Sequence, residues 1–252
     1  MEKEWTCKTF RILALGDSYT VGEGLETTQS FPNEIARLLS ALRRPEHKRR
    51  PCSAVTIDVV AKTGWTTDEL LKGMSESDAC GASCRYDLVT LLIGVNNQYR
   101  GRSSDEFVAD FEALLKMALE FADGLPNRVV VLSIPDWGIT PFAAKEKKDS
   151  FLIAGQIDDF NAVIYRLAKR YRMHFINVTP WTREAQSDPG LLAADGLHPS
   201  GREYTRWAEA VLKKLQDHER KTQTRVNTSL ENCANCGIDG IFRPLYKLFS
   251  WA

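Results

Sequence analysis

Two short segments of the sequence carry side chains that together could perform acyl transfer. Gly16-Asp17-Ser18-Tyr19 lies near the N-terminus, and Asp195-Gly-Leu-His198-Pro lies far downstream. The three-residue spacing allows the Asp195 carboxylate to accept a hydrogen bond from Nδ1–H of His198, which leaves Nε2 to accept the proton of a serine. An acid, a base and a nucleophile are the groups that covalent acyl transfer needs.

The sequence before Ser18 indicates how that serine is positioned. Arg11-Ile-Leu-Ala-Leu15 is a short apolar run that Gly16 ends. This pattern is typical of a buried strand followed by a turn. In parallel α/β sheets, ligands bind outside the carboxyl ends of the strands, so a serine in this turn is well placed for chemistry. The alternative is that Asp17 and Ser18 only cap the next helix.

Histidine is scarce, and three of the four histidines have simple structural explanations. His47 lies in the basic stretch Arg43 to Arg50, His174 begins an apolar strand pattern, and His218 follows a helix that ends in charge. His198 differs because it lies in a loop with Gly and Pro. The following Ser200-Gly-Arg-Glu203 has the spacing of a capping box, which predicts a helix start. Taken alone, this segment also fits an ordinary surface loop.

Two further strand ends carry groups that suit an oxyanion hole. Asp87 to Ile93 is typical of a central strand, and Gly94-Val-Asn96-Asn97 follows it. The Asn96 amide could donate to a developing oxyanion, although an ordinary Asn-Asn turn is the alternative. Val59 to Thr63 ends in Gly64-Trp65, where Gly64 can present a bare backbone N–H to a ligand.

These blocks resemble those of the SGNH/GDSL hydrolase family, in the same order along the chain. The resemblance covers roughly residues 10 to 216 and rests on Gly16 to Tyr19, Gly64, Gly94 to Asn96, and Asp195 to His198. It implies Ser18 as nucleophile, His198 as base and Asp195 as the residue that orients the base. It also implies an oxyanion hole made by the Ser18 and Gly64 N–H groups and the Asn96 side chain. Two positions depart from the family pattern, Asn97 in place of Asp and Tyr19 in place of Leu.

Strand and helix patterns alternate along the chain, which predicts an α/β fold with helices on both faces of a parallel sheet. We expect a three-layer α/β/α sandwich around a flavodoxin-like, doubly wound parallel sheet of five strands. The strand patterns lie near residues 11–15, 55–61, 87–93, 128–134 and 174–178. The helix patterns lie at 31–43, 67–73, 149–171 and 201–217, and from a capping box at Ser103 to Glu106 onward.

Length and composition fit one core domain with an extension. The 252 residues are 43% hydrophobic, and 33 basic and 33 acidic residues give a formal net charge of zero. We expect a hydrolase domain over residues 1–218 and an extension over 219–252 that packs on it or is partly flexible. The extension ends in apolar and aromatic residues, for which self-association and contact with a lipid surface are alternatives. With neither a long apolar run nor a signal-like N-terminus, we expect a cytoplasmic protein without a transmembrane segment.

Several residues near the strand ends are candidates for the substrate pocket. They are Asp17, Tyr19, Trp65, Asn97, Tyr99 and Trp137. Trp137 belongs to an apolar loop, residues 134–142, that could form a pocket wall. The alternative is that these aromatic residues pack the loops onto the sheet. Arg100 and Arg102 could attract an acidic substrate, but a solvated loop is the preferred interpretation.

The six cysteines could suggest a metal site. Cys80 and Cys84 form one close pair and Cys233 and Cys236 another, while Cys7 and Cys52 stand alone. Four thiolates could bind zinc, but no further ligand pattern supports this, and free thiols or an adventitious disulfide are preferred. We expect no metal and no cofactor.

The sequence therefore predicts a serine ester hydrolase that cleaves carboxylic esters of small or medium acyl chains through an acyl-enzyme on Ser18. The same residues would also serve a carbohydrate O-deacetylase, a lysophospholipase or a thioesterase. A non-catalytic binding module, with the basic stretch contacting an acidic partner or nucleic acid, is the alternative from another class. The expected partner is a small-molecule ester and not nucleic acid, and the oligomeric state is left open.

Overall fold

A five-stranded sheet forms the centre of the molecule. The computed structural model describes residues 9–42, 54–77 and 85–234. Strands β1 (Phe10–Gly16), β2 (Val55–Ala61), β3 (Leu88–Leu92), β4 (Val129–Leu132) and β5 (His174–Ile176) are all parallel. Their order is β2-β1-β3-β4-β5, the doubly wound, flavodoxin-like order. The predicted fold class is confirmed.

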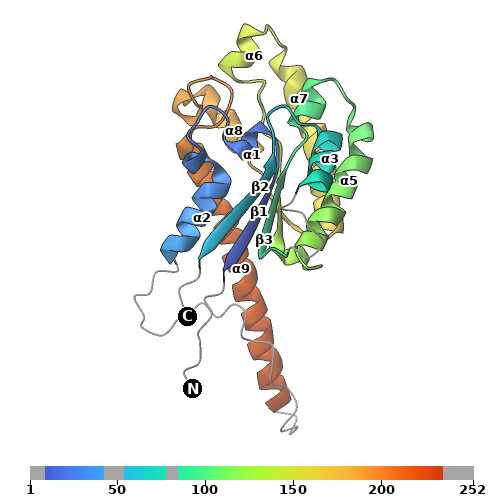
Figure 1. Cartoon of the computed structure of the whole chain (residues 1–252), viewed down its shortest axis with the longest axis vertical. Coiled ribbons are helices and arrows are strands. Elements are labelled where there is room, and N and C mark those ends of the chain that lie inside the picture. Colours follow the sequence, from blue (N-terminus) through green and yellow to red (C-terminus); the bar gives the residue numbers. More distant parts are fainter. Residues whose placement is uncertain (1–8, 43–53, 78–84, 235–252) are drawn as a thin grey trace.

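The strands are apolar because both faces of the sheet are covered (Figure 1). Helices α2 (Phe31–Leu42) and α9 (Gly201–Ala234) pack together on one face, and α3 (Thr67–Glu76), α5 (Ser104–Phe121) and α7 (Ser150–Arg170) cover the other. Every residue of β3 and β4 is buried, as expected for central strands of a parallel sheet. β2 is an edge strand, and most of its residues are only partly buried or exposed.

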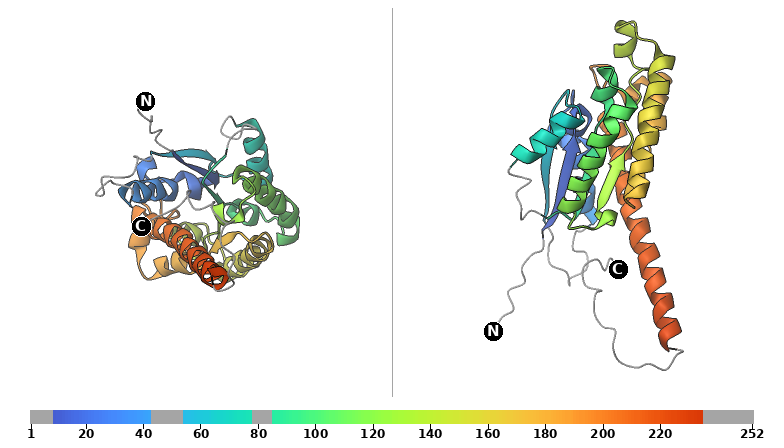
Figure 2. Two further views of the ribbon diagram at one scale, coloured as in Figure 1. Left: turned by 90° about the horizontal axis from the view of Figure 1, so that it is seen from below. Right: turned by 90° about the vertical axis from the view of Figure 1, so that its right-hand side faces the viewer.

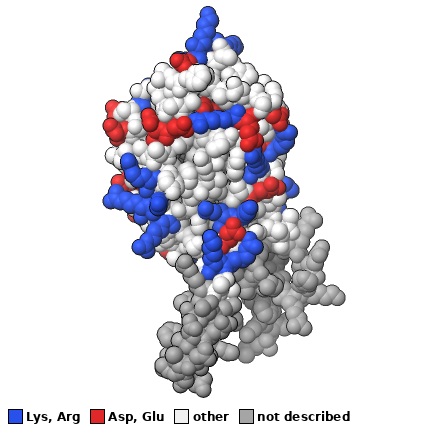
Figure 3. Space-filling view, turned by 180° about the vertical axis from the view of Figure 1, so that it is seen from behind, with Lys and Arg blue, Asp and Glu red and all other residues white. Residues whose placement is uncertain are grey.

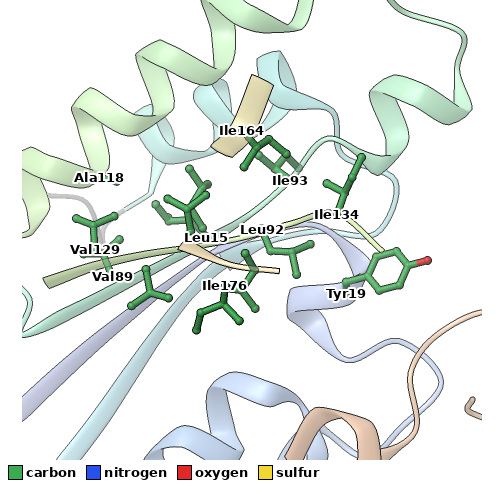
Figure 4. Packing of buried hydrophobic residues seen from close by; sticks show 14 of the residues in the cluster. Leu15, Tyr19, Val89, Leu92, Ile93, Ala118, Val129, Ile134, Ile164 and Ile176 are labelled. Carbon is green, nitrogen blue, oxygen red and sulfur yellow. The ribbon is translucent and has the colours of Figure 1, made fainter. Parts of the chain in front are cut away.

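The core continues from the sheet to the carboxyl ends of the strands. Figure 4 shows Leu15, Leu92 and Ile134 in one apolar cluster, with Tyr19 near its edge. The capping box predicted at Ser103 is present, since the Ser103 hydroxyl accepts from the Glu106 amide and the Glu106 carboxylate accepts from the Ser103 amide. A fixed start of α5 aligns its apolar face with the sheet.

Short elements connect the strands to the long helices, and the sequence patterns did not predict them. They are α1 (Ser18–Val21), α4 (Val95–Tyr99), α6 (Pro141–Lys145) and α8 (Thr179–Arg183), with 3-10 turns at Thr27–Gln29, Pro126–Arg128, Glu184–Gln186 and Pro189–Leu191. They are too short for helical periodicity to show. α1 and α4 directly follow β1 and β3 and so lie at the edge of the sheet where ligands bind.

Helix α9 begins at Gly201 as predicted, but its length and its N-terminal hydrogen bonds differ from the prediction. It continues to Ala234, well beyond the predicted end at residue 217, so His218 lies within the helix and the predicted boundary after 218 falls inside one continuous element. The helix projects beyond the end of the domain opposite α6 (Figures 1 and 2). The capping box predicted at Ser200 is wrong. Glu203 is buried and accepts from Nε1 of Trp207 instead, because the large indole one turn later draws the carboxylate into the core.

The described surface is mixed in charge. Figure 3 shows Lys and Arg side chains interspersed with Asp and Glu over one face of the molecule. This agrees with the net charge of zero. In the described ranges, no helix combines the length and the apolar character needed to cross a bilayer.

Candidate active site

Ser18 begins a helix directly after the central strand β1. The turn between them is so tight that only glycine fits at position 16. A Cβ atom there would lie 2.1 Å from Oγ1 of Thr20 and 2.3 Å from the carbonyl oxygen of Leu92. Asp17 caps α1, since its Oδ1 accepts from the Tyr19 amide at 3.0 Å. The capping interpretation thus holds for Asp17, while the Ser18 hydroxyl has a different partner.

The hydroxyl of Ser18 lies in line with a histidine and a carboxylate. Nε2 of His198 is 2.9 Å from Oγ of Ser18, and Nδ1 of His198 is 2.6 Å from Oδ2 of Asp195. Ser18 and His198 are 5% and 6% exposed, so water competes little for these hydrogen bonds. The order of groups is that of a nucleophile, a general base and the carboxylate that orients the base.

The two oxygens of Asp195 have separate tasks. Oδ1 accepts from the backbone amides of Leu197 and His198, at 2.9 and 3.0 Å, and so fixes the loop. Oδ2 is left for the imidazole. Burial alone would raise the pKa of Asp195, but the hydrogen bonds from the His198 ring and from the two amides outweigh it and lower the pKa. The carboxylate therefore stays ionised and holds Nδ1 as the protonated nitrogen.

The groups proposed for an oxyanion hole come from three adjacent strands. Ser18, Gly64 and Asn96 follow β1, β2 and β3. Among the described residues, no acceptor engages the backbone N–H of Ser18 or of Gly64. Nδ2 of Asn96 donates one hydrogen to the carbonyl oxygen of Trp65 at 3.0 Å, which leaves its second hydrogen for another acceptor. Gly64 has φ +83°, a conformation that favours glycine.

The carboxyl group of Asp17 is fully buried beside the nucleophile. Its Oδ2 has no hydrogen-bond partner in the described part of the chain. Burial raises the pKa of Asp17 to about 7, although the Tyr19 amide and the backbone of Asp17 itself act in the opposite direction. Near neutral pH this carboxyl group is thus only partly ionised, which gives folding stability a pH dependence.

Stability relative to an Asp17→Asn variant is expected to fall as pH rises. Between the unfolded pKa of 3.8 and the folded pKa of about 7, the native state holds a proton that the unfolded state releases. Raising the pH then favours unfolding, by roughly 4 kcal/mol over the whole interval for a shift of this size. Asparagine keeps the Oδ1 cap and does not titrate. Urea unfolding of both proteins from pH 4 to 8 measures the difference, which should level off above pH 7, and parallel curves would contradict the expectation.

The predicted pocket residues lie in different environments. Tyr19 is buried with its ring 4.9 Å from the His198 ring. Trp65 packs over Gly73 of α3, where a Cβ atom would be 2.2 Å from the indole. Asn97 is buried, accepting from the Thr67 amide and donating to the Thr67 hydroxyl.

Tyr99 and Trp137 were predicted either to line a substrate pocket or to pack the loops onto the sheet, and the two residues differ in this respect. Trp137 is buried, donates from Nε1 to the side chain of Gln98 at 2.7 Å and packs its ring against Tyr99. Tyr99 itself is 48% exposed. The Trp137 loop therefore packs onto the domain, and of these two aromatic residues Tyr99 is the one that presents a large surface to solvent.

Arg100 and Arg102 are both paired with carboxylates of α3. Arg102 contacts Asp68 at 2.6 Å, and Arg100 contacts Glu69 at 3.3 Å. Arg100 also donates from Nη2 to the carbonyl oxygen of Gly64 at 2.7 Å. The interpretation of Arg100 as a solvated loop residue missed this contact. The available signal was its position four residues after Asn96, which places both on one side of a helix.

Some sequence predictions concern residues outside the described ranges or their side chains. These are the cysteines at 7, 52, 80, 84, 233 and 236, the basic stretch 43–50 with His47, and the aromatic residues after 234. In residues 9–42, 54–77 and 85–234, no group of three or more His, Cys, Asp or Glu side chains is placed to hold a metal ion.

Comparisons with known proteins bear on the same residues. The model of the GDSL-like Lipase/Acylhydrolase family matches residues 14–206. No curated protein matches the chain. Among solved structures, a lipase/acylhydrolase from Enterococcus faecalis is similar at TM-score 0.62 and 17% identity, over 83% of this chain and 97% of that one.

Two further structures show the same fold. An acetylxylan esterase from Geobacillus stearothermophilus is similar at TM-score 0.61 and 18% identity, over 83% of this chain and 95% of that one. The psychrotrophic esterase EstA from Pseudoalteromonas sp. is similar at TM-score 0.56 and 15% identity, over 85% of this chain and 98% of that one.

Proposed function

Because this chain belongs to the GDSL-like Lipase/Acylhydrolase family, we propose that it hydrolyses carboxylic esters through a covalent acyl-enzyme on Ser18. The observation that carries the proposal is the unbroken series Ser18 Oγ, His198 and Asp195, with contacts of 2.9 and 2.6 Å. The family and its esterase relatives agree with action on ester bonds.

The first step is attack of Oγ of Ser18 on the ester carbonyl. His198 takes the hydroxyl proton at Nε2 as the C–O bond forms. The carbonyl oxygen becomes negatively charged and accepts from the Ser18 and Gly64 amides and the free hydrogen of the Asn96 side chain. When the tetrahedral intermediate collapses, the bond to the alcohol breaks and His198 gives its proton to the leaving oxygen.

Water completes the cycle by the same route in reverse. His198 takes a proton from water, the resulting hydroxide attacks the acyl carbon, and Oγ of Ser18 leaves with the proton from Nε2. Asp195 remains ionised throughout and stabilises the imidazolium that forms in each half-reaction.

We propose that the substrates are carboxylic esters of small to medium acyl chains. Of the aromatic residues that could line an acyl pocket, Trp137 is buried and Trp65 lies over α3. Tyr99 is exposed and lies in α4, the helix that also carries Asn96. Its ring offers an apolar surface large enough for a short acyl group or for one edge of the alcohol portion. The triad itself would serve acetyl esters of carbohydrates equally well.

A phosphonate that mimics the tetrahedral intermediate is expected to modify Ser18 alone. The serine should displace the leaving group of a p-nitrophenyl phosphonate, so that the protein gains the phosphonyl mass and loses ester hydrolysis in parallel. The EstA structure reported above is that of an esterase inhibited by monoethylphosphonate. Peptide mass spectrometry locates the adduct. Continued hydrolysis of p-nitrophenyl acetate by fully modified protein, or an adduct on another residue, would refute the proposal.

A further inference from the structure

The Gly64 turn needs support from outside its own strand. β2 is at the edge of the sheet and pairs with β1 alone among the described strands. The turn that follows it, residues 62–65, includes Gly64 with φ +83° and is partly exposed. An oxyanion donor must nevertheless be held in a fixed direction before the reaction, because a donor that must reorient gives little transition-state stabilisation.

Helix α4 supplies this support through consecutive contacts with the loop. The Arg100 guanidinium, just after α4, donates to the Gly64 carbonyl, the Asn96 amide donates to the Trp65 carbonyl, and the Asn97 amide contacts Thr67. On the other side of the turn, the Thr63 hydroxyl donates to the carboxylate of Glu23, which follows α1. The turn is thus held between the helix of the nucleophile and the helix of the Asn96 donor.

Arg100 makes the contact closest to the proposed Gly64 donor. Its Nη2 is 2.7 Å from the Gly64 carbonyl oxygen, and its Nη1 is 3.3 Å from the Glu69 carboxylate. Glu69 in turn accepts from the Thr66 amide at 2.8 Å and forms the capping box of α3. A guanidinium can serve both acceptors at once because its N–H groups form a rigid planar fork, whereas the ammonium of lysine has no such geometry.

We propose that Arg100 is a positioning residue for the oxyanion hole: by holding the Gly64 carbonyl it restricts the backbone of Gly64 and so keeps the N–H on the preceding peptide unit directed at the developing oxyanion. This inference rests on the proposed ester hydrolysis. Arg100 acts through Gly64 and does not touch the reacting atoms. Its loss should therefore weaken transition-state binding much more than ground-state binding, which appears in kcat and not in KM.

Arg102 provides a matched control. It lies in the same loop, forms a similar ion pair with the neighbouring carboxylate Asp68, and has a side chain 36% exposed, against 43% for Arg100. No contact joins it to Gly64 in the described part of the chain. Arg102→Gln therefore removes an ion pair that supports α3 and leaves the Gly64 turn in place.

The test compares Arg100→Gln, Arg100→Lys and Arg102→Gln in the full chain with p-nitrophenyl acetate. Arg100→Gln should lower kcat by about 10- to 100-fold, less than the 10²- to 10³-fold typical of deleting an oxyanion donor. KM should change less than about threefold and the pH midpoint of kcat should stay the same, since the triad is intact. Arg100→Lys should recover part of the loss, and Arg102→Gln should stay within about twofold of the original chain, as expected for an exposed ion pair.

Two results would overturn the inference. One is a kcat of Arg100→Gln within twofold of the original chain, and the other is an equal loss in Arg102→Gln, which would mean that α3 is simply destabilised. Thermal unfolding midpoints are measured for all variants to identify a folding defect. If Arg100→Gln is destabilised, the test uses Arg100→Lys, which retains the charge and should still have a kcat below that of the original chain. Ser18→Ala, assayed alongside, separates the two proposals. An inactive Ser18→Ala with a fully active Arg100→Gln would refute only the role of Arg100.

Discussion

Replacing Ser18 by alanine is expected to lower kcat/KM for p-nitrophenyl acetate by roughly 10⁵- to 10⁶-fold, the size of effect seen when a triad nucleophile is removed. The side chain of Ser18 makes its hydrogen bond to His198 and is otherwise small and buried. Alanine keeps the helical backbone of α1 and the Asp17 cap, so the fold should be retained. The loss of rate then reports the loss of the nucleophile.

The matched control for this substitution is Ser187→Ala. Ser187 lies on the surface, and its hydroxyl donates to the Glu184 carbonyl. Its removal should leave kcat/KM within about twofold, as for most surface changes away from a site. Initial rates and thermal midpoints are measured on proteins prepared identically. A Ser18→Ala protein that folds and keeps more than a tenth of the activity would exclude the acyl-enzyme on Ser18.

The second large effect is expected from Asp195→Asn, which should lower kcat by about 10⁴-fold, as in other triads whose aspartate becomes an amide. The local geometry gives the reason. Oδ1 of residue 195 is held by the Leu197 and His198 amides, which require an acceptor. The amide nitrogen of asparagine must then occupy the Oδ2 position and donate to Nδ1 of His198. The ring proton of His198 then lies on Nε2, and a protonated Nε2 can no longer accept the proton of Ser18.

Asp188→Asn is the control, because Asp188 is exposed, pairs with Arg202 and caps a 3-10 turn close to the same loop. We expect its kcat to stay within about twofold of the original chain. Rates are measured at a fixed pH where the original chain is fully active, together with unfolding midpoints. Equal losses in the two variants would indicate a general disturbance of the loop and would contradict the orienting role of Asp195.

Local sequence patterns were sufficient for the strands and for the segments that carry Ser18, Gly64, Asn96 and His198. Apolar runs mark the strands, and Gly16, Gly64 and Gly94 mark turns at the carboxyl ends of three of them, which share one edge of the sheet. The segment of His198 was instead found from its spacing to Asp195. Contacts between individual side chains and their partners could not be predicted in this way. That Arg100 reaches Gly64, or that Trp207 takes the carboxylate of Glu203, depends on how helices pack after the strands are placed.

Burial was also difficult to predict for individual side chains. The sequence shows Trp137 and Tyr99 as two aromatic residues near strand ends, but only packing decides that one is buried against Gln98 and the other exposed. The length of α9 was underestimated for a related reason. Beyond residue 217 the apolar periodicity gives way to polar and charged residues, which a helix tolerates when it projects from the domain.

The edge position of β2 gives the two sides of the proposed site unequal support from the sheet. The nucleophile follows a strand with neighbours on both sides, whereas the Gly64 peptide follows a strand with one. Local opening costs least where a segment has few neighbours. Adaptation to new esters in the course of evolution is therefore expected to draw on the Gly64 side, while the serine, its helix and the strand beneath it stay unchanged.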